Sequence, residues 1–200
     1  MKFRIIGPLR SGLGLWTALA CSSLFTSCTN FHEVDPGRYY RSAQPDEEQL
    51  SGWIEAYGLK TVVKLNGGAP GDSDFDRSRE PALAAGAEFI HLPLSATKYP
   101  SPDDLVRLWE IFETAEYPVL VHCRAGADRT GLASAIYVLQ NTGDLNRARD
   151  QLNFFPYLHV GWDGTWVMDQ VFDLYEPFAT EMSFPKWART EYPGLVGPIR

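Results

Sequence analysis

The sequence is short of cysteine and of long apolar runs, and each shortage excludes a class of protein. It has three cysteines in 200 residues, at positions 21, 28 and 123. Only Cys123 lies beyond the N-terminal segment, so the body of the chain can form no internal disulfide and contains no C-x2-C metal-binding pair. The N-terminal apolar stretch, residues 13–25, is interrupted and too short for a membrane-spanning helix, which needs about 20 residues.

Basic residues are also outnumbered. The chain has 18 lysines and arginines against 25 aspartates and glutamates, a formal net charge of −7. Residues 1–28 contain basic residues and no acidic residue, so the remainder of the chain is more acidic still. This balance argues against nucleic acid, or an anionic membrane surface, as the main partner. An anionic substrate must therefore be attracted by a local site.

Residues 1–28 have the pattern of an export signal, in which a basic start precedes an apolar stretch. Small residues stand before a cysteine twice, at Cys21 and at Cys28, and both sites resemble the lipobox of bacterial lipoproteins, whose cysteine becomes the lipidated first residue. We favour Cys28 because it allows the longer apolar stretch; cleavage near Ala20 without lipidation is the alternative. The segment predicts a bacterial protein exported to the periplasm or cell envelope, with the lipid anchor as its membrane contact.

Strand and helix patterns alternate from residue 38 onward. The expected strands cover residues 38–41, 59–65, 89–94 and 119–123, and the expected helices cover 46–57, 75–85, segments starting at 101 and 129, and segments around 145–152 and 167–174. Such alternation predicts an α/β fold with a central, largely parallel sheet of four or five strands flanked by helices. We expect one domain over residues 29–176. Residues 177–200 are expected to form a C-terminal extension, either an extended wrap or a loose tail.

The stretch from residue 118 to residue 131 reads P-V-L-V-H-C-R-A-G-A-D-R-T-G. A short apolar strand ends at Cys123, five residues turn around Gly126, and a helix begins near Arg129. Backbone N–H groups of a loop at a helix N-terminus point inward and, together with the helix dipole, bind anions. The same field stabilises a thiolate, and the Arg129 guanidinium can bind two phosphate oxygens at once. The stretch therefore predicts a reactive cysteine in a phosphate-binding loop.

Two motifs in the chain resemble one known family. H-C-x5-R-T-G, from His122 to Gly131, resembles the signature of cysteine-dependent protein tyrosine and dual-specificity phosphatases. Y-R-S-x-Q-P, residues 40–45, resembles the opening of compact, atypical dual-specificity phosphatases of bacteria and fungi. The two matches bracket roughly residues 38–176. The resemblance implies a protein tyrosine phosphatase-like fold, a phosphorylated protein or small molecule as substrate, a monomer, and no cofactor or metal.

The resemblance also implies roles for individual residues. The Cys123 thiolate attacks phosphorus to form a phosphocysteine, which water then hydrolyses. Arg129 holds the equatorial oxygens through the transition state, and Thr130 donates its hydroxyl to the thiolate. His122 is expected to fix the loop through hydrogen bonds. The remaining substrate-binding positions are the loop residues Arg124, Ala125, Gly126 and Ala127.

The general acid is not where the resemblance leads us to expect it. Many family members carry an aspartate on a separate loop before the cysteine, but residues 91–99 contain no carboxylate, and Thr97 or Lys98 stands in its place. Asp103 and Asp104 follow soon after, but Ser101 and Asp104 have the spacing of a helix capping box. The alternative is Asp128, as in bacterial phosphatases with the pattern C-x-x-G-x-D-R-T-G. Many of those have lysine before the aspartate, associated with phosphoinositide hydrolysis, whereas this chain has Ala127.

The sequence is compatible with several functions. The leading one is a phosphomonoester hydrolase of dual-specificity or tyrosine phosphatase type; the same fold also serves phosphoinositide or inositol polyphosphate phosphatases. A rhodanese-like sulfurtransferase is a second enzyme reading, which the spacing from Cys123 to Arg129 argues against. A pseudophosphatase that binds phosphorylated ligands without turnover is the third. Arg41 and Lys98 are candidates either for substrate contact or for structural ion pairs, and the histidines are too scattered to suggest a metal site.

Overall fold

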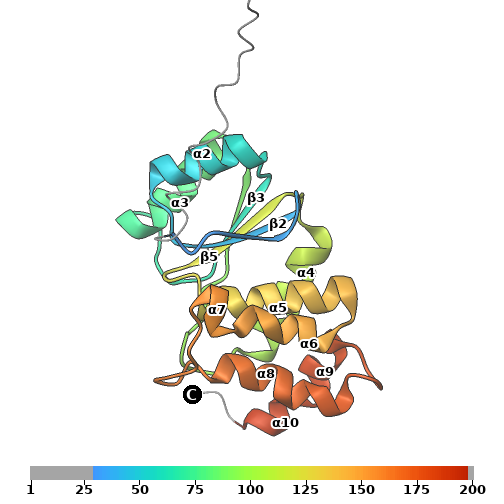
Figure 1. The fold of residues 1–200 in the computed structure, drawn as a ribbon. Coiled ribbons are helices and arrows are strands. Elements are labelled where there is room, and N and C mark those ends of the chain that lie inside the picture. The colour runs from blue at the N-terminus through green and yellow to red at the C-terminus, as the bar shows by residue number, and fades with distance from the viewer. Residues whose placement is uncertain (1–28, 198–200) are drawn as a thin grey trace, which may run out of the picture.

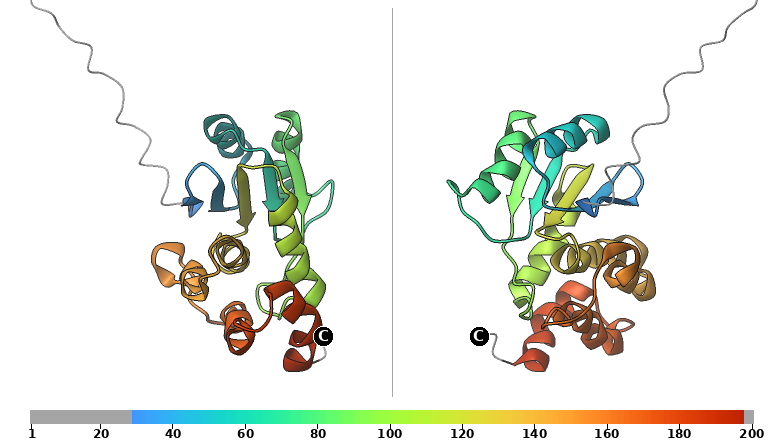
Figure 2. Two further views of the ribbon diagram at one scale, coloured as in Figure 1. Left: turned by 90° about the vertical axis from the view of Figure 1, so that its right-hand side faces the viewer. Right: turned by 60° about the vertical axis from the view of Figure 1, so that its left-hand side comes forward.

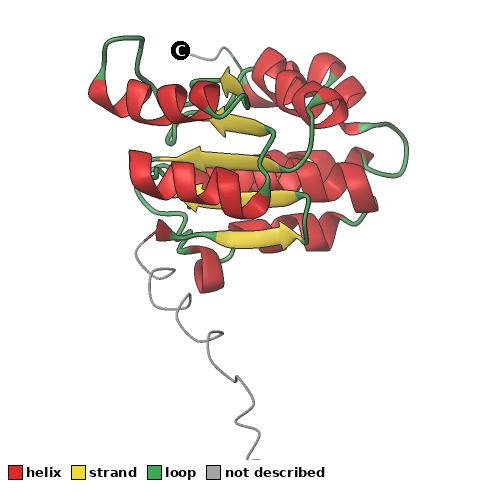
Figure 3. Ribbon diagram, turned by 90° about the horizontal axis from the view of Figure 1, so that it is seen from above, coloured by secondary structure: helices red, strands yellow, loops and turns green. Residues whose placement is uncertain are grey.

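The computed structural model describes residues 29–197, which fold around one five-stranded sheet flanked by helices (Figure 1). The strands are β1 (His32–Asp35), β2 (Tyr39–Ala43), β3 (Thr61–Lys64), β4 (Glu88–His91) and β5 (Val119–Cys123), in the spatial order β1-β2-β5-β3-β4. All neighbours pair in parallel except β1, an edge strand that runs against the others (Figure 3). This confirms the predicted α/β fold. The expected signal segment, with Cys21 and Cys28, lies outside the described residues.

Helices cover both faces of the sheet (Figure 2). They are α2 (Glu47–Tyr57), α3 (Ser73–Ala84), α4 (Pro102–Thr114), α5 (Asp128–Thr142), α6 (Leu145–Arg149), α7 (Phe154–Tyr157), α8 (Val167–Tyr175), α9 (Phe184–Thr190) and α10 (Tyr192–Val196), with 3-10 turns η1 (Asp150–Leu152) and η2 (Glu176–Phe178). Successive strand residues point to opposite faces. Accordingly, Val119 and Val121 of β5 pack with α4, α5 and α8, while Leu120 packs with α2 and α3.

The helix ends follow the local signals in the sequence. Asp46 caps α2 with a reciprocal bond to Gln49, and Gly58 ends the helix in the left-handed conformation. Ser101 caps α4, where its hydroxyl accepts from the Asp104 N–H and the Asp104 carboxylate accepts from the Ser101 N–H. These caps confirm the predicted starts of α2 and α4.

The C-terminal segment differs from the expected extended wrap or loose tail. It is helical, and α9 and α10 pack on α4 and α8. Phe184, Trp187 and Tyr192 are buried in the main core cluster, and the Tyr192 hydroxyl donates to the Pro100 carbonyl at 3.0 Å. The apolar area that these rings bury holds the segment in place. Within residues 29–197, none of the helices combines the length and the apolar character that a bilayer-spanning segment needs.

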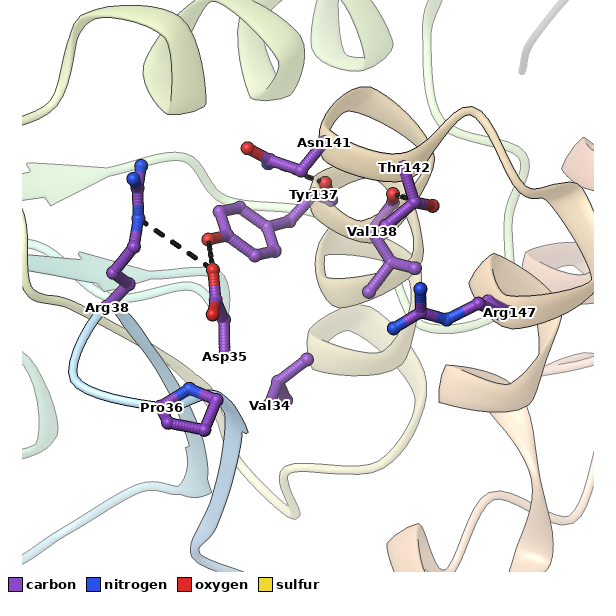
Figure 4. A pocket seen from close by; sticks show the side chains of 9 residues that line it. All are labelled: Val34, Asp35, Pro36, Arg38, Tyr137, Val138, Asn141, Thr142 and Arg147. Atoms are coloured by element: carbon purple, nitrogen blue, oxygen red, sulfur yellow. Dashed lines mark hydrogen bonds and ion pairs between the residues drawn. The ribbon is translucent and has the colours of Figure 1, made fainter.

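Strand direction positions the site. Because β2, β5 and β3 are parallel neighbours, their carboxyl ends meet at one edge of the sheet, where ligands bind in such folds. In register, Ala43 of β2 lies beside Cys123, and Lys64 of β3 lies beside His122. A cleft of about 350 Å³ lies between the β1–β2 turn and the last turns of α5 (Figure 4). Arg38 of this cleft precedes β2, which puts the cleft at the end of the sheet away from Cys123.

Candidate active site

Cys123 is the last residue of β5, and α5 begins five residues later, at Asp128. The cysteine is a free thiol and is buried. The residues between strand and helix form a tight loop, 124–127, which is the loop predicted from the sequence. The thiol therefore lies at the carboxyl edge of the sheet, directly before the N-terminus of a 15-residue helix.

The loop carbonyls are all held from the outside. The Arg124 carbonyl accepts from the Gln44 N–H (3.3 Å), that of Ala125 from Asn30 Nδ2 (3.0 Å), and those of Gly126 and Ala127 from Arg41 Nη2 (2.9 and 3.3 Å). In a planar trans peptide, the carbonyl of one residue and the N–H of the next point in opposite directions. Four carbonyls turned outward therefore turn the following N–H groups inward. The result is a concave set of amide donors next to the thiol, which is an anion-binding nest.

Arg41 forms the floor of this loop and is not a substrate-contacting residue, which corrects one of the two expectations for it. Its side chain is fully buried, and Nη1 also donates to the Gln151 carbonyl at 2.8 Å. The guanidinium carbon lies 3.9 Å from the centre of the Tyr157 ring, a cation–π contact. Burial lowers the pKa of Arg41 to about 10, so the side chain stays charged at neutral pH. The arginine of the Y-R-S-x-Q-P motif is thus a structural support for the loop.

Gly126 touches the neighbouring strand. Its φ is +70°, and a Cβ at this position would lie 2.4 Å from the Ala43 nitrogen and 2.5 Å from the Ser42 carbonyl carbon. These atoms belong to the backbone of β2, which cannot shift without disturbing the sheet. Only glycine fits here.

Replacing Gly126 with alanine is expected to destabilise the fold by about 3 kcal/mol, because the clash adds to the cost of a left-handed alanine. Urea unfolding measures the loss. Gly52→Ala is the matched control, since Gly52 lies within α2 with no atom within 4 Å of an added Cβ. That change should be neutral or stabilising, by up to about 1 kcal/mol. Equal effects at the two positions would contradict the close approach of loop and strand.

Arg129 lies in the first turn of α5 and reaches across to the loop after β4. Its Nη1 donates to the Leu94 carbonyl at a long 3.4 Å, and its buried Nε has no hydrogen-bond partner among residues 29–197. A buried, unpaired guanidinium N–H is costly unless a ligand satisfies it. Arg124, by contrast, is exposed, so its side chain is accessible to a substrate, as expected of a substrate-binding position.

His122 and Thr130 make fewer contacts than expected. Burial lowers the pKa of His122 to about 3, so the ring is neutral. Both of its ring nitrogens are enclosed and have no hydrogen-bond partner in the part of the chain that the structure describes. The Thr130 hydroxyl is likewise buried without a partner there, so the expected hydrogen bond from Thr130 to Cys123 is not formed.

Lys64 is a site residue that the sequence analysis missed. It ends β3, is fully buried, and its Nζ donates to Gln44 Oε1 at 3.1 Å. Burial lowers the pKa of Lys64 to about 8; the nearby charges of Asp74 and Cys123 act in the opposite direction, and Arg129 lowers it further. The sequence did contain a signal for it, because Lys64 interrupts the apolar run V-V-K-L and a lysine is seldom buried unless it has a polar partner.

The acid candidates are separated by the structure. Asp103 and Asp104 belong to the first turn of α4, where Asp104 completes the capping box, which confirms the capping interpretation. Thr97 and Lys98 are exposed on the loop after β4. Asp128 is the first residue of α5 and directly follows the phosphate-binding loop, with its side chain 19% exposed.

His159 is a second residue that the sequence analysis missed. Its Nδ1 lies 2.7 Å from Asp128 Oδ1, and its Nε2 lies 2.8 Å from Oδ2 of Asp169, on α8. Burial would lower the pKa of His159, but the two carboxylates outweigh burial and raise it to about 9. The two carboxylates lie on opposite sides of the ring and do not converge on one point. Across residues 29–197, no group of three or more histidine, cysteine or acidic side chains is arranged to hold a metal ion.

Replacing His159 with asparagine is expected to destabilise the fold most at low pH. The pKa of His159 is raised from 6.5 to about 9, so its stabilising charge is fully present below pH 6.5 and is lost as the pH rises through 9. The shift corresponds to roughly 3 kcal/mol at most. Urea unfolding of both proteins between about pH 6 and 9 measures the difference in free energy of unfolding. A difference that does not change with pH would contradict a charged ring between two carboxylates.

The segment that carries His159 also exposes large apolar side chains next to the loop. They are Phe154, Phe155, Leu158, Val160, Trp162 and Trp166. Asn30 Nδ2, which holds the Ala125 carbonyl, also donates to the Tyr157 carbonyl at 3.0 Å. The apolar segment is therefore tied directly to the phosphate-binding loop.

One comparison with known protein families decides the assignment. A family model described as "DSP-PTPase phosphatase fused to NAD+ Kinase" matches residues 23–155, more than half of the chain. The chain belongs to this dual-specificity phosphatase family. As a phosphatase of the cysteine-dependent class it is an enzyme by family and fold, which excludes the sulfurtransferase reading.

Two curated relatives of the phosphatase are plant enzymes. The chain is 26% identical to inositol diphosphatase DSP4 of Arabidopsis thaliana over 162 residues, which cover 78% of this chain and 67% of that protein. It is 28% identical to inositol diphosphatase DSP1 of Oryza sativa subsp. japonica over 155 residues, which cover 75% of this chain and 57% of that protein. The phosphatase thus spans from a little over half to two thirds of the length of these relatives.

Solved structures confirm the fold. TpbA of P. aeruginosa matches with a TM-score of 0.58 and 21% identity, covering 80% of this chain and 89% of that one. The core catalytic domain of the PP-IP phosphatase SIW14 from S. cerevisiae, in complex with citrate, matches with a TM-score of 0.58 and 22% identity, covering 86% and 96%. At this level of identity, the likeness establishes the protein tyrosine phosphatase-like architecture.

Proposed function

We propose that the chain hydrolyses phosphate monoesters through a phosphocysteine at Cys123. The observation that carries the proposal is the loop 124–127, in which four successive carbonyls are held outward and the following amides face inward. Together with Arg129, these amides supply the donors that a phosphoryl group requires at its equatorial oxygens in the transition state. The thiol at the end of β5 is the nucleophile.

The proposed reaction has two steps. The Cys123 thiolate attacks phosphorus, and the bond from phosphorus to the leaving oxygen breaks. Water then attacks the phosphocysteine, and the thiolate leaves. The buried positive charge of Arg41 and Lys64 near the loop attracts the phosphate in both steps. Thr130, whose buried hydroxyl is unpartnered among residues 29–197, is the proposed donor to the departing sulfur.

Asp128 is the proposed proton donor to the leaving oxygen in the first step and acceptor from water in the second. It directly follows the phosphate-binding loop as the first residue of α5, whereas Asp104 is engaged in the capping box of α4 and Asp103 is exposed beside it. A general acid matters most when the leaving group is a poor one. Residues 91–99, the loop on which many family members carry the acid, contain no carboxylate. The site is therefore best suited to substrates whose leaving group departs without full protonation.

Inositol diphosphates are a second candidate substrate class. Both plant relatives are named inositol diphosphatases. Cleavage of a diphosphate expels a phosphate, which needs less help from an acid than an alkoxide does. The exposed Arg124 and Lys98 provide positive charge for the remaining phosphates of such a ligand. Ala127, in place of the lysine of phosphoinositide-hydrolysing relatives, speaks against lipid headgroups.

Phosphate release from a matched panel tests both candidates. The panel contains a phosphotyrosine peptide, a phosphoserine peptide, a phosphoinositide, an inositol hexakisphosphate and an inositol diphosphate. A kcat/KM at least about tenfold higher for the diphosphate, a difference of about 1.4 kcal/mol in the barrier, would identify the second class. Tight binding without turnover of any member would contradict the proposal and favour a phosphate-binding pseudophosphatase.

We also propose that the protein is exported, on the basis of its N-terminal sequence pattern alone. The basic and apolar N-terminal segment supports delivery to the cell envelope, with Cys28 as the lipidated residue. Retention of a Cys28→Ala variant in the membrane fraction would contradict lipidation at Cys28, and release of a Cys21→Ala variant instead would move the site to Cys21.

A further inference from the structure

Asp128, His159 and Asp169 form a hydrogen-bonded row that leads from the start of α5 to α8. Its two contacts, at 2.7 and 2.8 Å, are short, and the His159 side chain is only 2% exposed. The family match ends at residue 155, before His159 and Asp169. Both residues lie beyond the end of that match.

The geometry restricts how protons are distributed in this row. A ring nitrogen that lies within 2.8 Å of an acidic oxygen needs a hydrogen between the two atoms. Both nitrogens of His159 face such an oxygen, so the three groups hold at least two protons between them. The arrangement in which the ring carries both protons leaves Asp128 and Asp169 as carboxylates, each accepting one charge-assisted hydrogen bond.

We propose that His159, held by Asp169, is a positioning residue that keeps Asp128 ionised and thereby selects substrates whose leaving groups depart with little protonation. The inference rests on the proposed function. Asp128 Oδ1 is engaged by the ring, so Oδ2 is the oxygen that exchanges a proton at the reacting centre. An ionised Asp128 is a poor donor to an alkoxide but a ready acceptor from water in the second step. The selected substrates are phosphoanhydrides and aryl phosphates with acidic phenols, rather than alkyl phosphates.

The other charged groups around Asp128 are the same in the wild type and in a variant changed at Asp169. Arg129 follows it on α5, Cys123 ends β5, Arg41 lies below the loop, and Lys64 ends β3. The groups that act on the His159 ring are Asp128 and Asp169. A change at Asp169 therefore reaches Asp128 through the ring.

Asp169→Asn is the test variant, and Asp173→Asn is its control. An asparagine can hydrogen bond to Nε2 without a negative charge, so the ring loses its second proton while Nδ1 still donates to Asp128. Asp173 lies on the same helix and pairs with Arg149 at 2.8 Å, so its substitution removes an equal charge without touching His159. The Asp169 side chain is 42% exposed, which favours a folded variant.

The measurement is the pH dependence of kcat/KM for phenyl phosphate and for 2,4-dinitrophenyl phosphate. In Asp169→Asn, the basic limb for phenyl phosphate should move to higher pH by about one unit. Above the wild-type limb, the ratio of phenyl to dinitrophenyl phosphate turnover should then rise by up to about tenfold. Asp173→Asn should leave the limb and the ratio as in the wild type. His159→Gln should move the limb in the same direction as Asp169→Asn.

NMR provides a readout that does not depend on turnover. The ¹⁵N shifts of His159 should show both ring nitrogens protonated at neutral pH in the wild type and one in Asp169→Asn. The ¹³C shift of the Asp128 carboxyl should titrate at higher pH in the variant. A neutral ring in the wild type, or an Asp128 titration that is the same in both proteins, would overturn the inference. An absence of turnover with the NMR shifts as expected would overturn the proposed function and with it the selection of leaving groups, but not the charge arrangement.

Discussion

Replacing Cys123 with serine is expected to abolish turnover while leaving oxyanion binding almost unchanged. A serine hydroxyl is far less acidic than the thiol and is not ionised by the loop, so the covalent step fails. Loss of a covalent nucleophile lowers kcat by about 10⁴–10⁶-fold. The amides of loop 124–127 and the Arg129 side chain remain in the variant, and these are the groups proposed to hold the phosphate. Steady-state kinetics and calorimetric titration with phosphate measure the two effects separately.

The matched variant for this experiment is Arg129→Met. It keeps the thiol but removes the guanidinium that is buried beside the loop, so phosphate affinity should fall together with kcat. Turnover by Cys123→Ser at more than about a thousandth of the wild-type rate would be incompatible with a phosphocysteine mechanism. Equal loss of phosphate affinity in both variants would show that the serine had disturbed the loop.

Replacing Asp128 with asparagine is expected to have the second largest effect, and the effect should depend on the leaving group. A general acid contributes about 10²–10⁴-fold where the leaving group needs a proton. On the acidic side of the basic limb, hydrolysis of alkyl phosphates and of phenyl phosphate should fall by up to this factor, whereas 2,4-dinitrophenyl phosphate should be spared. The basic limb of the pH–rate profile should flatten. Asparagine Oδ1 can still accept from His159 Nδ1, so the position of the side chain is kept.

Asp103→Asn and Asp104→Asn are the controls. Asp104 accepts the Ser101 N–H at the start of α4, and loss of such a cap costs about 0.5–2 kcal/mol of stability. Neither change should distinguish a phenyl from a dinitrophenyl leaving group. If one of them carries the leaving-group signature and Asp128→Asn does not, the acid lies on the upstream loop.

The fold was predictable where local signals agree with tertiary structure. Buried parallel strands are recognisable as short apolar runs. A capping residue such as Ser101 marks where a helix begins. The elements that were missed lack these signals. Strand β1, H-E-V-D, is recognisable only through its pairing with β2. Helices α9 and α10 contain Pro185 and Pro193, which suggested an extended chain, although proline is well accommodated in the first helical turn.

The residues of the candidate site also differ in how far they could be predicted from the sequence. Cys123, Asp128 and Arg129 are close in sequence, so their chemistry could be read from one stretch. His159 is 31 residues beyond Asp128 and stands alone in a segment of mixed character, where a single histidine carries no signal. Its role depends on the tertiary packing that brings His159 next to Asp128, at the start of α5, and places Asp169 of α8 on the other side of its ring.

The tether through Asn30 means that the site is assembled from the N-terminal end of the described chain and from a segment that follows α5. The Asn30 side chain donates both to the Ala125 carbonyl and to the Tyr157 carbonyl, which lies 127 residues from Asn30 along the chain. A nascent chain that has emerged only as far as α5 already contains Cys123 and Arg129, but it lacks the segment that completes the support of the loop. In such a chain the cysteine would behave as an ordinary thiol. The reactivity that the proposed function requires of Cys123, and the sensitivity to peroxide that accompanies it, would arise only after residue 157 has been made and has met Asn30.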